Sequence, residues 1–146
     1  MPEHKTLIFV LAVLYSMDQE RRGIGPSESF ENVLQNRRGV NLHRAWLKLK
    51  REGLLGKFGQ DFDYDPLYDV SSFLTKILSE ACVSYLLIRL DGTNFAYHLD
   101  QVSSDDMRRF LQQGKIPEKQ VQKAAARMNE LLDEQASIAK SSTGSV

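Results

Sequence analysis

Cysteine is almost absent from this chain of 146 residues, in which Cys82 stands alone. One thiol cannot close a disulfide within the chain, and it cannot supply a cysteine-rich zinc site. Cys82 lies between Ala81 and Val83, so we expect a small buried side chain rather than a nucleophile. The lack of a disulfide framework fits a reducing compartment.

Long apolar runs are also lacking. The most apolar stretch is Leu7–Tyr15, which is too short for a bilayer span of ~20 residues. No small-residue cleavage motif follows it, so a signal peptide is not expected. The stretch predicts a helix that is buried on nearly all sides. We expect a cytoplasmic protein with no membrane partner.

Net charge is the third thing missing, because 19 basic side chains balance 19 acidic ones. The 42% apolar and 26% charged residues are typical of one soluble globular domain. The balance hides a strong local asymmetry. Residues 37–57 hold seven basic and one acidic side chain, whereas residues 58–69 hold four aspartates and no base. The zero sum therefore does not exclude a polyanion as partner.

The apolar spacing and the capping residues predict a mainly helical α+β fold. Helices are expected at Thr6–Asp18, Pro26–Gln35, Asn41–Glu52, from Ser71 or Ser72 to about Ala81, after Ser103, and from Pro117 to about Ala139. Val83–Leu90 and Phe95–Leu99 read as a β-hairpin around a tight turn. We divide the chain into residues 1–70, residues 71–140 and a disordered tail, 141–146.

The helix expected at Asn41–Glu52 carries most of the basic charge. Arg44, Lys48 and Arg51 follow one another at i, i+4 and i+7, opposite the apolar face of Leu42, Trp46 and Leu49. A helix with one anchored face and one basic face suits docking against DNA, because its cations reach phosphates and arginine can also pair with guanine. The alternative is a charged face that is merely solvated.

The stretch Asn41–Leu55, in which a basic helix ends in Glu52, Gly53 and two leucines, resembles the recognition helix of winged helix-turn-helix DNA-binding domains. The resemblance covers residues 6–70. It implies a second helix at Pro26–Gln35, a turn at Arg37–Val40 and a wing at Gly56–Val70. It also implies a non-catalytic double-stranded-DNA-binding protein that regulates transcription. The DNA-binding residues we expect are Arg37, Arg38, His43, Arg44, Lys48, Lys50 and Arg51.

The acidic segment 58–69 leaves the partner open, since its carboxylates would repel a phosphate backbone. The segment could point away from DNA, contact a protein, or fold onto the basic helix and mask it. The alternative function is therefore a protein-interaction module, as a subunit or inhibitor within a larger nucleoprotein assembly.

The last predicted helix repeats its apolar residues at a spacing near 3.5 over about three heptads. This stripe either packs on its own domain or pairs two chains into a homodimer, which would suit two DNA half-sites. The dimerisation residues predicted are Val121, Ala125, Met128, Leu131 and Leu132.

No constellation in the sequence predicts catalysis. Asp61, Asp63 and Asp65 are spaced as at the start of a calcium-binding loop, but Pro66 and Ser72 occupy positions that need glycine and glutamate. His98 and Asp100 share one face of a predicted strand and support only a weak hypothesis of a small hydrolase, because no nucleophile accompanies them. We therefore expect neither an enzyme nor a bound metal or cofactor.

Overall fold

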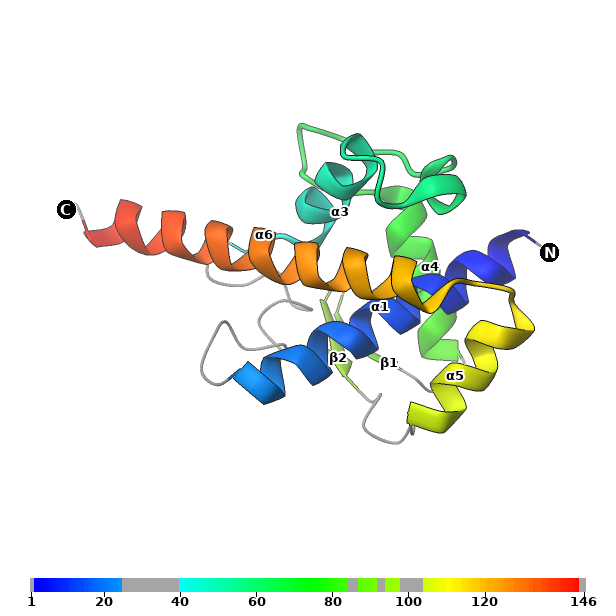
Figure 1. Cartoon of the computed structure of the whole chain (residues 1–146). Coiled ribbons are helices and arrows are strands. Elements are labelled where there is room, and N and C mark those ends of the chain that lie inside the picture. Colours follow the sequence, from blue (N-terminus) through cyan, green and yellow to red (C-terminus); the bar gives the residue numbers. More distant parts are fainter. Residues whose placement is uncertain (1, 25–39, 84–86, 92–93, 98–103, 145–146) are drawn as a thin grey trace.

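A computed structural model describes residues 2–24, 40–83, 87–91, 94–97 and 104–144. These residues form five α-helices, one short 3-10 helix and two short strands, shown in Figure 1. In chain order the elements are α1 (Pro2–Ile24), α3 (Leu42–Arg51), η1 (Gly56–Gly59), α4 (Ser72–Val83), β1 (Leu87–Asp91), β2 (Asn94–Tyr97), α5 (Ser104–Gln113) and α6 (Glu118–Gly144).

Helix α1 is the centre of the molecule. All six residues from Phe9 to Leu14 are buried, and so is Met17 one turn later. Consecutive residues point in all directions around a helix, so burial of the whole run means that neighbours cover every side. Those neighbours are α4, α5 and α6, together with α3 and η1. The prediction of a helix buried on nearly all sides is confirmed.

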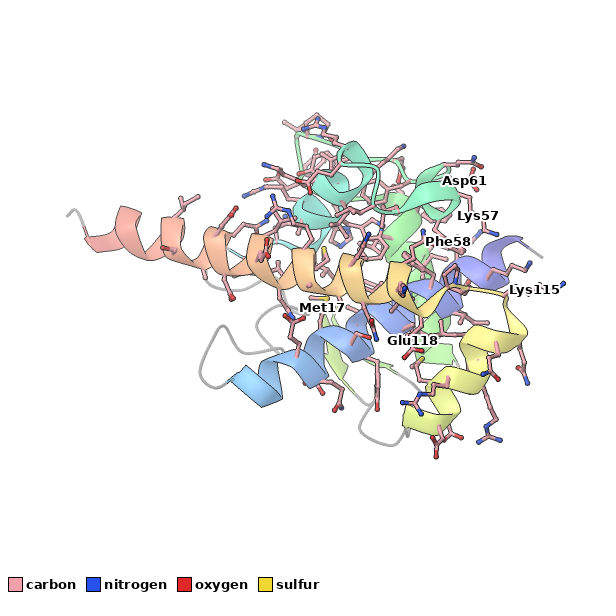
Figure 2. All side chains as sticks on the ribbon, in the orientation of Figure 1. Met17, Lys57, Phe58, Asp61, Lys115 and Glu118 are labelled. Atoms are coloured by element: carbon pink, nitrogen blue, oxygen red, sulfur yellow. The ribbon has the colours of Figure 1, made fainter. Side chains whose placement is uncertain are left out.

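An aromatic cluster fixes α3 and η1 against α1. The Phe9 ring stacks on Phe58 with 4.4 Å between centroids and meets Trp46 edge-on at 6.1 Å. Phe62 is buried as well, one turn beyond Phe58. Figure 2 shows Phe58 directed toward α1, with Lys57 and Asp61 on the outside of this segment. Each buried aromatic contributes about 1.5–3 kcal/mol to folding, which holds the segment close to the core.

The predicted α+β fold class with a β-hairpin wing is wrong. The fold is mainly helical, and residues 56–70 form η1 and a series of turns instead of two strands. Their only ladder contact in the described chain is an isolated bridge between Asp65 and Val70. Phe58 and Phe62 are both buried, and their amides donate to the carbonyls of Leu55 and Gly59, three residues earlier in each case. These turn hydrogen bonds take the place of a strand ladder.

Further along the chain, β1 and β2 pair antiparallel into a short ribbon, in which Ile88 lies opposite Ala96. This ribbon follows α4 and is not part of the expected wing. Among the described residues, β1 lies against α4.

Two helix ends also differ from the predictions. Helix α1 continues to Ile24, beyond the expected end at Asp18, and α6 continues to Gly144, into the expected disordered tail. The predicted helix Pro26–Gln35 lies outside the described residues. Residues on both sides of the proposed boundary at position 70 share one core, so the division into 1–70 and 71–140 does not separate two cores.

Candidate nucleic-acid interface

Helix α3 begins and ends as its sequence predicts. The Asn41 side chain accepts a hydrogen bond from the Arg44 amide at 3.0 Å and so caps the helix. At the other end Gly53 adopts a left-handed backbone, with φ at 77°. Leu54 and Gly53 then donate their amides to the carbonyls of Leu49 and Lys50, which closes the last turn. Both ends are fixed by local signals.

Helix α3 lies antiparallel to α6, and polar contacts join the two along their length. Near the start of α3, the Asn41 amide donates to Gln135 Oε1 at 2.6 Å. At its end, Arg127 forms two hydrogen bonds with Glu52 at 2.9 and 3.1 Å. These contacts hold one side of α3 against α6, while residues 58–70 cover another. One strip of the helix surface remains open.

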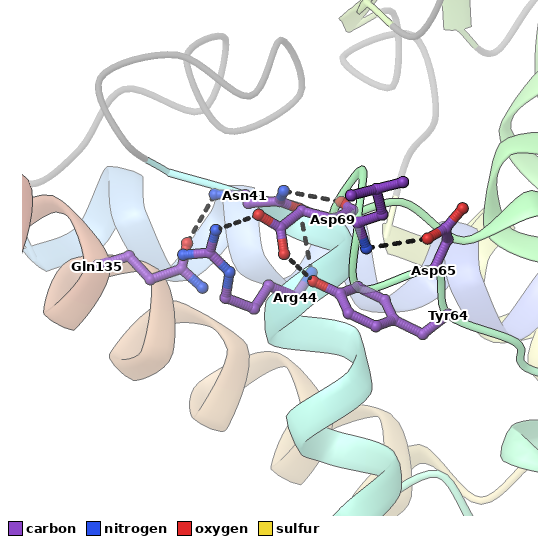
Figure 3. Close-up of polar contacts among 7 residues, drawn as sticks. Asn41, Arg44, Tyr64, Asp65, Asp69 and Gln135 are labelled. Atoms are coloured by element: carbon purple, nitrogen blue, oxygen red, sulfur yellow. Dashed lines mark hydrogen bonds and ion pairs between the residues drawn. The ribbon is translucent and has the colours of Figure 1, made fainter.

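Arg44, the first cation on this strip, is tied to the acidic segment. Its guanidinium contacts Asp69 Oδ2 at 2.8 Å, and the Tyr64 hydroxyl donates to the other carboxylate oxygen at 2.5 Å (Figure 3). The bond from Tyr64, followed by that from Arg44, lowers the pKa of Asp69. The Asn41 side chain also donates to the Asp69 carbonyl at 2.9 Å. Of the three arrangements considered for the acidic segment, masking of the basic helix therefore holds at Arg44.

Two other predicted contacts are occupied by the fold itself. Lys50 donates to the Phe62 carbonyl at 2.8 Å and lies 6.0 Å from the centre of that ring. His43 is buried, and its Nδ1 accepts the Ser71 amide at 2.9 Å. Burial lowers the pKa of His43 to about 4, although the nearby Asp63 carboxylate opposes the shift. A neutral, buried imidazole cannot contact a phosphate.

Lys48 and Arg51 remain exposed on the open strip, one turn apart. Neither forms an ion pair within the part of the chain that the structure describes. Arg37 and Arg38 lie outside the described residues. Of the five predicted DNA-binding residues that the structure describes, Lys48 and Arg51 are thus the ones free to meet a ligand.

The fold adds two lysines that sequence reasoning missed. Lys119 and Lys123 on α6, with Gln120 between them, line a surface hollow of about 340 Å³ beside Gly53 and Leu54. Their i, i+4 spacing was visible in the sequence, but only the antiparallel packing of α6 brings them to the end of α3. We call Lys48, Arg51, Lys119 and Lys123 the cationic surface.

The predicted dimerisation stripe lies inside the molecule. Its five residues, Val121, Ala125, Met128, Leu131 and Leu132, are each at most 4% exposed. Helices α1 and α3 of the same chain cover α6. The spacing therefore described an intramolecular contact, and a homodimer through these residues would require α6 to leave the core.

Among the described residues, the Asp63 carboxylate of the calcium-loop candidate serves the fold. Asp63 accepts hydrogen bonds from the Phe73 amide and the Ser71 hydroxyl, both at 2.9 Å, at the start of α4. These bonds, that from Phe73 first, lower its pKa, which marks a structural carboxylate. No group of metal-binding side chains occurs among the described residues. His98 and Asp100 lie outside them.

Comparison with known proteins does not extend this description. Protein-family models, curated proteins and solved structures each give no match to the chain. Within the residues described, no helix combines the length and apolarity needed to span a membrane.

Proposed function

We propose that this chain is a non-catalytic protein that binds double-stranded DNA through its cationic surface. The observation that carries the proposal is the exposure of Lys48 and Arg51 on a helix whose opposite face is buried in the core. An anchored helix presents its cations at fixed positions, so less side-chain and backbone freedom is lost on binding.

The charges around this surface support a polyanion as partner. Glu52 follows Lys48 by one helical turn, and Arg127 already pairs with it. Hydrogen bonds from Arg127, and more weakly the charge of Lys48, lower the pKa of Glu52. Lys119 and Lys123 extend the positive potential across the end of α3. A surface of this kind attracts phosphates over a Debye length of about 8–10 Å.

The expected mode is contact with the DNA backbone. In helix-turn-helix proteins the first residues of the recognition helix reach the base edges. Here that end is tied down by Asn41, Asp69 and Gln135, and no wing accompanies it. Phosphate contacts give affinity without reading sequence, so regulation at a specific DNA site is not part of the proposal.

Fluorescence anisotropy of a labelled duplex at low salt tests this function. The double variant Lys48→Glu/Arg51→Glu should bind at least about tenfold more weakly than the unaltered chain, since each lost phosphate contact removes favourable counterion release. Arg108→Glu/Arg109→Glu is the matched control, because it changes the charge equally on the exposed face of α5. Absence of affinity for the duplex, or equal weakening in both variants, would overturn the proposal.

A second candidate is protein–protein interaction, as a module or subunit of a larger assembly. One observation favours it: two large apolar side chains, Leu67 and Tyr68, stand in solvent beside the Arg44–Asp69 contact. Exposed apolar clusters on otherwise soluble surfaces commonly mark interaction sites.

A further inference from the structure

The turn between Asp65 and Val70 presents an apolar tip, which we define as Pro66, Leu67 and Tyr68. Leu67 is 79% exposed and Tyr68 is 73% exposed. Both are large side chains, and they are adjacent in sequence within the acidic segment. Tyrosine in such a position is enriched among residues that carry much of the binding energy at interfaces.

The tip is held rigidly although it is exposed. Asp65 and Val70 exchange backbone hydrogen bonds at 2.8 and 3.4 Å, and the Asp65 carboxylate accepts the Leu67 amide at 2.9 Å. Asp69 has φ at 52°, a conformation that costs a non-glycine residue energy, and its bonds to Tyr64 and Arg44 maintain it. A tip fixed in advance loses little conformational entropy when it is bound.

A complementary hollow lies at the opposite end of α3. Gly53, Leu54 and Gln120 line it together with Lys119 and Lys123, and its volume of about 340 Å³ can receive an aromatic side chain. Neither lysine forms an ion pair within the described residues. Asp65 directly precedes the tip, and its exposed carboxylate is opposite in charge to the two lysines of the hollow, whereas Asp69 on the other side is already paired with Arg44.

The two features cannot meet within one chain. Asp69, which directly follows the tip, pairs with Arg44 in the first turn of α3, whereas the hollow begins directly after the last turn of this helix. Ten residues of α-helix separate them by about 15 Å. The tip and the hollow both lie at the molecular surface, so each is available to another molecule.

We propose that the tip of one copy of this chain inserts into the hollow of a second copy. Tyr68 and Leu67 would occupy the hollow next to Leu54, and Asp65 would approach Lys119 and Lys123. The contact is head-to-tail, since it joins different surfaces of the two copies, and it can therefore extend beyond a dimer. A net charge of zero removes the overall repulsion that keeps charged proteins apart.

This inference goes beyond the proposed DNA binding and does not rest on it. The two are nevertheless linked, because Lys119 and Lys123 belong to both the hollow and the cationic surface. DNA and a second copy of the chain should compete for these lysines.

Sedimentation velocity over a wide range of protein concentration tests the association. The unaltered chain should sediment faster as its concentration rises. Leu67→Ser/Tyr68→Ser and Lys119→Glu/Lys123→Glu should each raise the apparent dissociation constant by roughly tenfold or more. Phe110→Ser/Ile138→Ser is the control, because it removes the other two large apolar side chains that are exposed among the described residues. Circular dichroism shows whether each variant is folded.

Mixing the two variants makes the test sharper. The tip variant retains an intact hollow, and the hollow variant retains an intact tip, so an equimolar mixture should form a dimer that grows no further. A monomeric unaltered chain at all concentrations, unchanged association in either variant, or a monomeric mixture would overturn the proposal. The tip variant should still bind duplex DNA, so failure of the association and failure of DNA binding are distinguishable.

Discussion

At the scale of single residues, His43 shows how part of a basic segment is taken into the core. Its imidazole is buried and accepts the Ser71 amide through Nδ1, which requires the neutral form. This hydrogen bond joins α3 to the start of α4, where Ser71 in turn caps the helix through the Leu74 amide.

The folding free energy should therefore depend on pH through His43. Burial lowers the pKa of His43 from 6.5 to about 4. Between pH 6.5 and pH 4 this side chain therefore binds a proton in the unfolded chain but not in the native chain. The free energy of unfolding should fall as pH drops from about 6.5 to 4, by about 3 kcal/mol in total. Urea unfolding at several pH values measures this slope. In His43→Asn the slope should be much smaller, since the amide oxygen can accept the same bond without titrating; an equal slope would contradict the assignment.

Asp69 is the second residue whose substitution has a predictable effect, here on the affinity for DNA. Asp69→Asn removes the charge that holds Arg44, while asparagine tolerates the left-handed backbone. The affinity for duplex DNA at low salt should rise about two- to tenfold as Arg44 becomes available. The cost in stability should stay below about 1 kcal/mol, because the ion pair is half exposed.

The matched control for this change is Asp61→Asn, which alters the net charge equally on an exposed side chain of the same segment. If both variants gain affinity to the same extent, the gain reflects overall charge, and Arg44 is not masked by Asp69.

At the scale of elements, the end of α3 depends on one glycine. Gly53 has φ at 77°, and an added Cβ would meet nothing within 4 Å. Gly53→Ala should therefore cost about 1–2 kcal/mol from backbone strain alone. Gly53→Asn should cost less, because asparagine adopts this conformation more readily. Equilibrium urea unfolding measures both, and equal losses would exclude the backbone as their source.

Helix α6 makes a second prediction at this scale. Leu132 is fully buried, so Leu132→Ala should lower the free energy of unfolding by about 2–5 kcal/mol. Ile138→Ala, on an exposed position of the same helix, should change it by less than about 0.5 kcal/mol. If the Leu132→Ala chain kept its stability but sedimented as a smaller species than the unaltered chain, the apolar stripe of α6 would instead lie at an interface between chains.

The elements that could be predicted are those set by local signals. Asn41 caps the start of α3 and Gly53 ends it, each through contacts with residues within one turn. Ser71 caps the start of α4 in the same way. The wing could not be excluded from the sequence, because the alternation around Phe62 suits a strand. The turns of residues 56–70 accompany a long-range contact, that of Phe58 with Phe9, which the sequence does not reveal.

The residues of the candidate site also fall into a group that the sequence predicts and a group that it does not. The exposure of Lys48 and Arg51 follows from the helical period, which could be predicted. The loss of Arg44 to Asp69 and of His43 to the core depends on contacts across 25 and 28 residues. Lys119 and Lys123 looked like the solvated face of an isolated helix. Their place beside Gly53 arises from the packing of α6 on α3.

At the scale of the whole molecule, the zero net charge is the sum of surfaces with opposite sign. The end of α3 and the start of α6 gather lysine and arginine, while residues 58–69 and the later turns of α6 carry carboxylates such as Asp65, Glu130 and Glu134. A molecule polarised in this way can bind a polyanion with one surface although its total charge is zero.

The dependence of duplex affinity on salt tests this account most directly. Four phosphate contacts by the cationic surface predict that log K falls against log salt with a slope of about −3 to −4. Lys48→Ala/Arg51→Ala should reduce the magnitude of that slope by about 2. No measurable affinity at the lowest salt, or a slope that the double variant leaves unchanged, would contradict DNA binding through this surface.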